Sequence, residues 1–139
     1  MHLRKLMAIG LTLRLLLMKL ADLVHTPAQT NPALYHRLLK LKEDIYARSQ
    51  QEWCAEATAR QLSLSLSHLQ HSYKNCFGVS FKQDVLAARL QYAQHLLFTT
   101  NDTISSVAQA CGFASDVHFM RLFKKHVSLT PTDYRKSGG

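Results

Sequence analysis

Residues 104–125 read ISSVAQACGFASDVHFMRLFKK, and the rest of the chain is understood most easily from this stretch. Apolar residues recur three and four positions apart on both sides of Gly112, which is typical of two helices joined by a tight turn. Ala108 lies where the two helices would cross, since a larger side chain there would force them apart. The stretch therefore predicts a helix-turn-helix unit. The core of this unit is expected to contain Val107, Phe113 and Phe119.

The same pattern occurs about 50 residues earlier in the chain, so the sequence contains an internal repeat. Leu69 corresponds to Phe119 at an offset of 50 residues, whereas Ala59 corresponds to Ala108 at an offset of 49. One of the two units therefore carries one extra residue. The sequence predicts two helix-turn-helix motifs, at about residues 53–77 and 103–127.

A helix over residues 81–99 is predicted to join the two units. It opens with Ser80 and Gln83 at the spacing of a capping box, and Asn101 and Asp102 are expected to end it and to cap the next helix. Its 19 residues span roughly 28 Å, and successive major-groove faces on one side of DNA lie about 34 Å apart. A rigid helix of this length could hold the two units over adjacent grooves. Two apolar stripes predict two packing surfaces, one for each unit. One stripe comprises Phe81, Val85, Ala88 and Tyr92, and the other comprises Leu86, Leu90, Ala93 and Leu97.

The remaining segments are also predicted to be helical, since no sustained two-residue alternation occurs. Asn31 and Pro32 are typical of an N-cap and the first helical position, and an apolar stripe follows them. The alternating residues 63–67 are interpreted as a turn and cap, and Thr130 with Pro131 opens a short last helix. The sequence therefore predicts an all-α fold. The apolar stripe that follows Pro32 comprises Leu34, Leu38, Leu41 and Ile45.

The Leu-rich segment at residues 3–24 precedes this region. Its apolar residues follow a heptad seam from Leu6 to Leu23, which predicts an extra N-terminal helix. Arg14 and Lys19 interrupt the run, which disfavours a membrane span or a signal peptide. Two interpretations remain: a dimerisation helix, and the last helix of a larger domain. We favour the second interpretation.

The composition narrows the classes of function. The 139 residues include 17 Lys and Arg against 9 Asp and Glu, a formal net charge of +8, which favours an anionic partner. Cys54, Cys76 and Cys111 form no C-x-x-C pair, which excludes a zinc ribbon and indicates reduced thiols in a cytoplasmic protein. His68 and His71 lie one turn apart near Cys76, but no fourth ligand has suitable spacing, so we expect no metal. No residues group as nucleophile, base and orienting partner, and Gly-rich phosphate loops are absent from the sequence, so we expect neither an enzyme nor a cofactor.

These motifs resemble the AraC/XylS family of bacterial transcription regulators. The similarity covers about residues 34–135. It is most specific in Ile104-x-x-Val107-Ala108-x-x-x-Gly112-Phe113, in Phe119-x-x-x-Phe123-Lys124-Lys125 and in Thr130-Pro131-x-x-Tyr134-Arg135. The resemblance implies seven helices, two helix-turn-helix motifs and activation through RNA polymerase. It also implies that residues 1–30 are a remnant of an effector or dimerisation domain, ahead of a DNA-binding domain at 31–139. Three residues depart from the family pattern: Ser128 replaces the usual Gly, His118 a common aromatic, and Tyr73 a common Phe.

The second helix of each unit is expected to enter the major groove of DNA. Gln70 has the geometry to pair with adenine, Arg121 with guanine, and Val117 to contact a thymine methyl. The lysines suit phosphates, as do the backbone amides at Ser80 and Thr130. The candidate residues of the first helix are Ser67, His68, Gln70, His71 and Lys74. Those of the second helix are Asp116, Val117, His118, Arg121, Lys124 and Lys125.

The sequence thus favours a DNA-binding transcription regulator, acting as an activator, that places two recognition helices in adjacent major grooves. Double-stranded DNA and RNA polymerase are the expected partners, with a homodimer through residues 3–24 as a further prediction. The alternative is a truncated regulator that acts on full-length relatives through its Leu-rich helix. A basic protein on an acidic membrane surface is a third interpretation, which the motifs disfavour, and we expect no membrane partner.

Overall fold

The computed structural model describes residues 31–138, which form seven helices and no strand. The all-α prediction is therefore confirmed over this range. The predicted Leu-rich helix at 3–24 lies outside the described residues. Among the helices that are described, none has the length and hydropathy that a membrane crossing requires. The helices are α2 (Pro32–Ala47), α3 (Ala55–Gln61), α4 (Leu66–Phe77), α5 (Phe81–Thr99), α6 (Ile104–Ala110), α7 (Asp116–Val127) and α8 (Pro131–Ser137).

Local capping interactions explain where the longer helices begin. At the start of α5, the Gln83 amide donates to Ser80 Oγ at 3.1 Å, and the Ser80 amide donates to Gln83 Oε1 at 3.0 Å. The predicted capping box is confirmed. At the start of α2, Asn31 Oδ1 accepts from the amide of Ala33 at 3.0 Å, with Pro32 at the first helical position. Both caps use donors that a helix leaves without an intrahelical partner.

The boundary between α5 and α6 differs from the prediction. Asn101 and Asp102 neither end α5 nor cap α6. The C-cap of α5 is Thr100, and the N-cap of α6 is Thr103, whose Oγ1 accepts from the amide of Ser106 at 3.1 Å. Consecutive polar residues are all acceptable caps in isolation. The choice among them depends on where the apolar residues of α6 meet the core.

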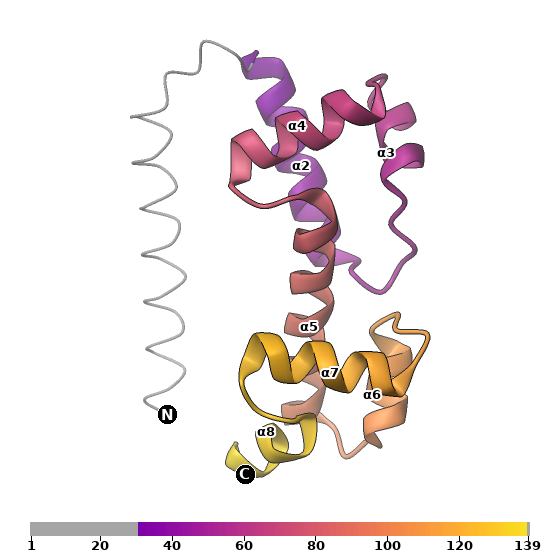
Figure 1. Cartoon of the computed structure of the whole chain (residues 1–139), viewed down its shortest axis with the longest axis vertical. Coiled ribbons are helices and arrows are strands. Elements are labelled where there is room, and N and C mark those ends of the chain that lie inside the picture. The colour runs from indigo at the N-terminus through magenta and orange to yellow at the C-terminus, as the bar shows by residue number, and fades with distance from the viewer. Residues whose placement is uncertain (1–30, 139) are drawn as a thin grey trace.

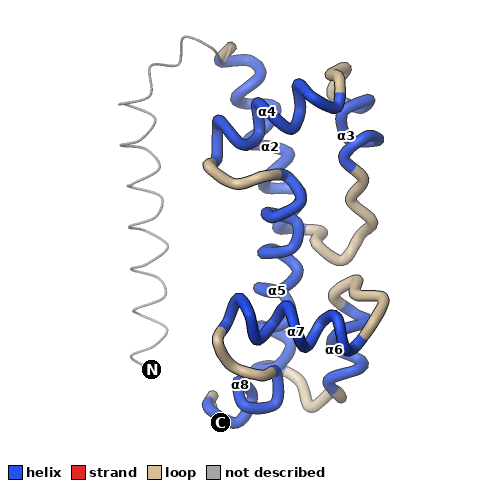
Figure 2. The backbone as a smooth tube through the Cα atoms, in the orientation of Figure 1, coloured by secondary structure: helices blue, strands red, loops and turns tan. Residues whose placement is uncertain are grey.

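Helix α5 forms the axis of an elongated molecule and carries one bundle at each end (Figure 1). Helices α2, α3 and α4 surround its first half, and α6, α7 and α8 surround its second half (Figure 2). The first core contains Leu38, Ile45, Leu69, Tyr73, Phe81, Val85 and Ala88 among its buried residues. The second contains Leu90, Ala93, Leu97, Val107, Phe113, Phe119 and Phe123. The prediction of two packing surfaces on α5 is confirmed.

Tyr92 is an exception to the predicted stripes. It was expected to pack with Phe81, Val85 and Ala88, but it contacts the second core instead. Eleven residues separate it from Phe81, about 16 Å along the helix axis. That distance carries Tyr92 beyond the first bundle.

The two helix-turn-helix units close their turns in the same way. The amide of Leu64 donates to the carbonyl of Ala59 at 2.8 Å, and the amide of Phe113 donates to the carbonyl of Ala108 at 3.0 Å. Both alanines are buried, as predicted for close helix crossings. The extra residue of the repeat is Ala114, which lies between this closed turn and the N-cap of α7.

Candidate nucleic-acid interface

Helices α4 and α7, the second helix of each unit, are the predicted recognition helices. Figure 1 shows that they run roughly parallel, with α4 in front of α2 and α7 in front of α5. Each runs from its short partner helix, α3 or α6, across the axis. This arrangement presents two exposed helix faces toward one side of the molecule.

The outward face of α7 follows from what is buried behind it. Phe119 and Phe123 are fully buried. Val117, Arg121 and Lys124 are exposed, and their spacing of four and three residues aligns them along the opposite face. This line combines an apolar side chain, a guanidinium and an ammonium group.

The outward face of α4 has the same construction. Leu69 and Tyr73 are fully buried, whereas Ser67, His71 and Lys74 are exposed and aligned at the same spacing. Each of these three residues precedes its counterpart in α7 by 50 positions. The repeat therefore extends to the position of the side chains on the outward faces.

The other predicted contacts flank these two lines. His68, Gln70 and Lys125 are exposed beside them. The exposed ring of His118 packs edge-on against Phe113, with ring centroids 6.5 Å apart, so His118 also covers the core.

Asp116 is exposed in the first turn of α7. It lies three residues before Phe119 and seven before Phe123, so it falls on the side of the helix that these residues bury, and the prediction that it shares the outward face is wrong. A carboxylate there stabilises the helix N-terminus.

Two exposed residues that the sequence analysis missed belong to these faces. Asn75 Nδ2 lies 3.1 Å from His71 Nε2, so it orients the imidazole at the centre of the α4 line. Met120 is 43% exposed and lies three residues after Val117. The helical spacing alone would have indicated both positions.

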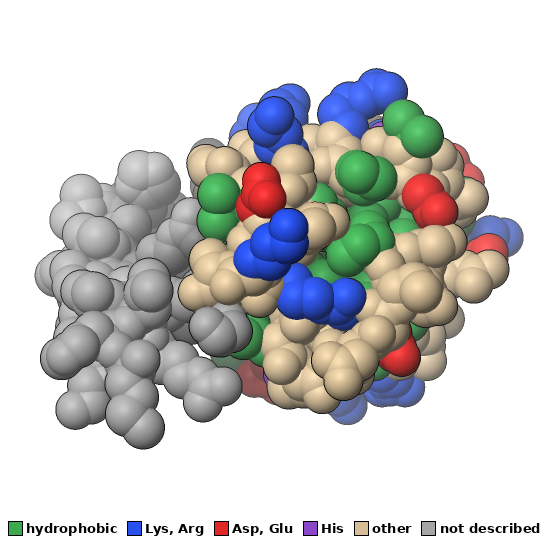
Figure 3. Space-filling model, turned by 90° about the horizontal axis from the view of Figure 1, so that it is seen from below, with side chains coloured by type: hydrophobic (Ala, Val, Ile, Leu, Met, Phe, Trp, Pro, Cys, Tyr) green, Lys and Arg blue, Asp and Glu red, His purple; other side chains and the backbone are tan. Residues whose placement is uncertain are grey.

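The charge of the interface is predominantly positive. The last turn of α7 contains Lys124, Lys125 and His126, and that of α4 contains Lys74. Figure 3 views the molecule from the end formed by α6–α8 and shows Lys and Arg side chains spread around a central apolar area, with two groups of them on the upper edge. Cations at helix C-termini also interact favourably with the helix dipole.

The backbone amides proposed for phosphate binding are partly engaged. In the capping box the amides of Ser80 and Gln83 already donate to each other's side chains. At α8 the Asp133 amide donates to Thr130 Oγ1 at 3.1 Å. Fewer amide donors are therefore open to a phosphate than the sequence suggested.

A buried carboxylate fastens α4 to its neighbours. Asp84 of α5 accepts from Lys42 Nζ and from the hydroxyl of Tyr46, both at 2.7 Å, and also from the hydroxyl of Tyr73. Burial, and then the adjacent Asp84, raises the pKa of Tyr73 far above its ordinary value, so this hydroxyl remains a donor. The network joins α2, α4 and α5 and so orients the first recognition helix.

Arg89, in the middle of α5, joins the two units. Its Nε donates to the carbonyl of Ser49 at 3.0 Å, and its Nη2 donates to that of Gln51 at 2.9 Å. Gly112 approaches the same place, because a Cβ there would lie 3.1 Å from the carbonyl oxygen of Gln50. The loop after α2, the axis helix and the turn of the second unit therefore meet at one point.

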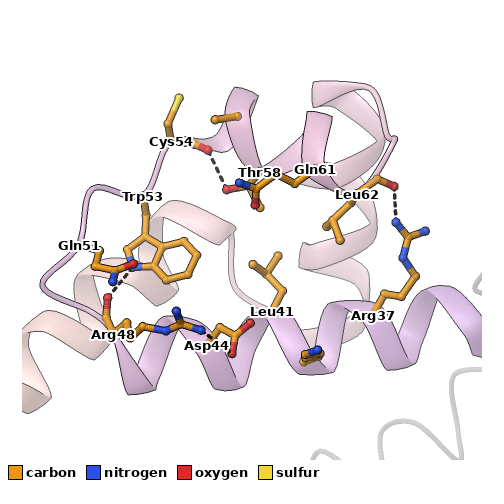
Figure 4. A pocket seen from close by; sticks show the side chains of 12 residues that line it. Arg37, Leu41, Asp44, Arg48, Gln51, Trp53, Cys54, Thr58, Gln61 and Leu62 are labelled. Atoms are coloured by element: carbon orange, nitrogen blue, oxygen red, sulfur yellow. Dashed lines mark hydrogen bonds and ion pairs between the residues drawn. The ribbon is translucent and has the colours of Figure 1, made fainter.

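A pocket with a cavity volume of about 580 Å³ lies between α2 and α3, away from the recognition helices (Figure 4). Trp53 Nε1 donates to the carbonyl of Arg48 at 2.9 Å at one end of the pocket, and Arg37 donates to the carbonyl of Leu62 at the other. Its polar groups are thus largely used to hold the loop before α3 and the turn after it. Over residues 31–138, no three His, Cys, Asp or Glu side chains gather as metal ligands would.

Comparison with known proteins identifies the family. A family described as a helix-turn-helix domain matches residues 58–137, more than half of the chain. The AraC-type DNA-binding regulator of Chromobacterium violaceum superposes with a TM-score of 0.70 and 25% identity, over 78% of this chain and 97% of that one. The chain belongs to the AraC/XylS family.

Two further proteins extend this comparison. The transcriptional activator RhaS of Klebsiella pneumoniae (strain 342) is 35% identical over 109 residues, which are 78% of this chain and 38% of RhaS. The DNA-binding domain of AdpA, solved with a target DNA, shares the fold with a TM-score of 0.68 at 23% identity, over 72% of this chain and 90% of that one.

The AraC/XylS family consists of DNA-binding transcription regulators and not of enzymes. The described residues form the DNA-binding domain of such a regulator.

Proposed function

We propose that this protein is a sequence-specific transcription activator that inserts α4 and α7 into successive major grooves of double-stranded DNA. One observation carries the proposal. Helices α4 and α7 lie on the same side of the molecule, and each carries an aligned row of exposed side chains backed by buried aromatic or leucine side chains. An α-helix fits the major groove, and two such helices on one side reach two grooves.

The chemistry of the exposed rows supplies both kinds of contact that DNA recognition needs. Arg121 matches the two acceptors of guanine, and Gln70 matches adenine. Lys74, Lys124 and Lys125, toward the helix C-termini, suit phosphates, which set affinity and register. Two similar proteins support the proposal: the DNA-binding domain of AdpA was solved with a target DNA, and RhaS is a transcriptional activator. RNA polymerase is the second partner that activation requires.

Selection of bound sites from random DNA tests sequence-specific binding. A single preferred site is expected, with an affinity that falls steeply as salt rises. Arg121→Ala should reduce the preference for one base pair by about 1–3 kcal/mol. Lys124→Ala should weaken binding to all DNA sequences equally, and the slope of log affinity against log salt concentration should fall by about 1.

Lys40→Ala, at an exposed lysine of α2, is the matched control and should leave both quantities unchanged. Binding without any preferred sequence would overturn the proposal.

Transcription from a template carrying the selected site, with purified RNA polymerase, tests the activator role. More transcript in the presence of the protein is expected, and less would indicate a repressor.

Sedimentation of the full chain, with and without residues 1–30, tests the predicted homodimer. A monomer in both cases would exclude dimerisation through that segment.

A further inference from the structure

The outward face of α7 carries two exposed apolar side chains next to its guanidinium. Val117 is 66% exposed and Met120 is 43% exposed. Their spacing of three residues, with Arg121 four residues after Val117, places the three side chains on one patch of the helix surface. We name Val117 and Met120 the apolar pair.

Packing among residues 31–138 does not account for the apolar pair. The core side of α7 is occupied by Phe119 and Phe123, which are fully buried. Phe98, another exposed apolar residue, packs edge-on against Tyr134 with ring centroids 5.2 Å apart. The apolar pair instead lies on the face that we propose enters the groove.

The corresponding positions of α4 are polar. Fifty residues before the apolar pair, the exposed side chains are Ser67 and Gln70. The buried residues behind them, Leu69 and Tyr73, match the two phenylalanines of α7. The two recognition helices thus share their backbone placement and differ in the chemistry that they present.

Charge indicates which partner the apolar pair meets. Arg121, Lys124 and Lys125 follow it on the same helix. An apolar protein surface would leave these cations without partners, whereas DNA supplies phosphates for them. In the major groove thymine alone presents a methyl group, so the apolar pair has an apolar target there.

On the basis of the proposed function, we propose that α7 reads thymine methyl groups, next to the guanine that Arg121 binds. Helix α4 reads its half-site through hydrogen bonds from Ser67, Gln70 and His71. The two half-sites of the operator therefore differ in kind. Only the half-site under α7 depends on thymine methyl groups.

Replacement of thymine by uracil tests this inference, because it removes the methyl and leaves the base pair intact. Each thymine of the selected site is replaced in turn, and the affinity is measured. Loss of one buried methyl should weaken binding about fourfold at one or two positions under α7. Positions under α4 should show no change. Arg121→Ala and His71→Ala assign each half-site to its helix through the base at which preference is lost.

A matched variant carries the chemistry of α4 onto α7. Val117→Ser with Met120→Gln reproduces the residues of α4 at exposed positions, so the fold is retained. This variant should bind thymine and uracil sites equally, and the reciprocal Ser67→Val with Gln70→Met should create a methyl dependence under α4.

The outcomes separate the inference from the proposed function. Equal affinity for thymine and uracil at every position, with the site preference intact, would overturn the inference alone. Methyl dependence that persists in the Val117→Ser, Met120→Gln variant would do the same. Absence of any preferred site would overturn the proposed function first.

Discussion

Gly78 and Ser128 end the two recognition helices with the same left-handed backbone, at φ 75° and 70°. In each case the amide of the cap residue donates to the carbonyl four residues earlier. The amide of Gly78 donates to the carbonyl of Lys74 at 2.8 Å, and the amide of Ser128 donates to the carbonyl of Lys124 at 2.9 Å. Glycine adopts this conformation freely, whereas a residue with a Cβ incurs about 1–2 kcal/mol. Ser128, which replaces the usual Gly of the family, therefore has a strained backbone.

The Ser128→Gly variant should therefore be more stable than the parent chain. We expect a gain of about 0.5–1 kcal/mol in the free energy of unfolding, since relief of strain exceeds the added entropy of the unfolded chain. Gly78→Ser is the converse variant, and it should lose a similar amount because no atom lies within 4 Å of its Cβ position. Urea unfolding followed by circular dichroism measures both. Unchanged stability of Ser128→Gly would argue against strain at this cap.

Gly112→Ala should destabilise the fold more than Gly78→Ala. Both glycines have positive φ, so each substitution incurs a backbone cost of about 1 kcal/mol or more. At Gly112 the new Cβ would also meet the carbonyl oxygen of Gln50 at 3.1 Å. We expect a total loss of about 2–3 kcal/mol there. Thermal unfolding of the two variants side by side gives the difference, and equal melting temperatures would mean that the loop of Gln50 moves aside freely.

Replacement of Arg89 should weaken the link between the two units. Arg89→Ala removes two charge-assisted hydrogen bonds, to the carbonyls of Ser49 and Gln51, and we expect a loss of about 2–4 kcal/mol. Arg89→Lys retains the charge but cannot reach both carbonyls, so its loss should be about half as large. Chemical denaturation provides the measurement.

The same variants should change how binding depends on half-site spacing. One base pair inserted between the half-sites of the selected DNA should weaken the parent chain strongly, since its units are held in a fixed relation. Arg89→Ala should lose less affinity on this insertion. An equal loss in both proteins would show that Arg89 does not set the spacing.

Tyr73→Phe isolates the hydroxyl that donates to Asp84 inside the first bundle. The variant restores the residue that is common in the family, yet it should cost about 1–2 kcal/mol, because a hydrogen bond to a buried carboxylate is lost. Tyr46→Phe, at a half-exposed donor to the same carboxylate, should cost less. Urea titration of both variants tests the order, and the reverse order would place the main support of Asp84 on the α2 side.

Alkaline pH should destabilise the fold through Cys111. Burial raises the pKa of this thiol to about 12 from an ordinary value of 9.0. The contribution of Cys111 to the free energy of unfolding is complete below pH 9, where the thiol is protonated in both the folded and the unfolded chain. It is lost between pH 9 and pH 12, because the thiol of the unfolded chain ionises first. Over this range the free energy of unfolding should fall by up to about 1.4 kcal/mol per pH unit. Denaturation across this range should show a shallower slope for Cys111→Ala than for the parent chain, with Cys54→Ala, at an exposed thiol, as the control.

Local patterns predicted most of the described fold and the position of its recognition helices. The capping box of Ser80 and Gln83 and the buried pair of Phe119 and Phe123 depend on residues three or four positions apart. Interactions at that range follow from helix geometry, which the sequence spacing specifies directly. The family resemblance followed from the same local features.

Contacts between distant segments could not be predicted in this way. Asp84 gathers donors from residues 11 to 42 positions away, and Arg89 reaches carbonyls 38 and 40 positions away. The sequence contains these side chains, but it does not show which surfaces of α2, α4 and α5 meet. Packing of the two bundles against α5 selects these partners, because a buried carboxylate or carbonyl requires a donor and only the assembled helices bring one within reach.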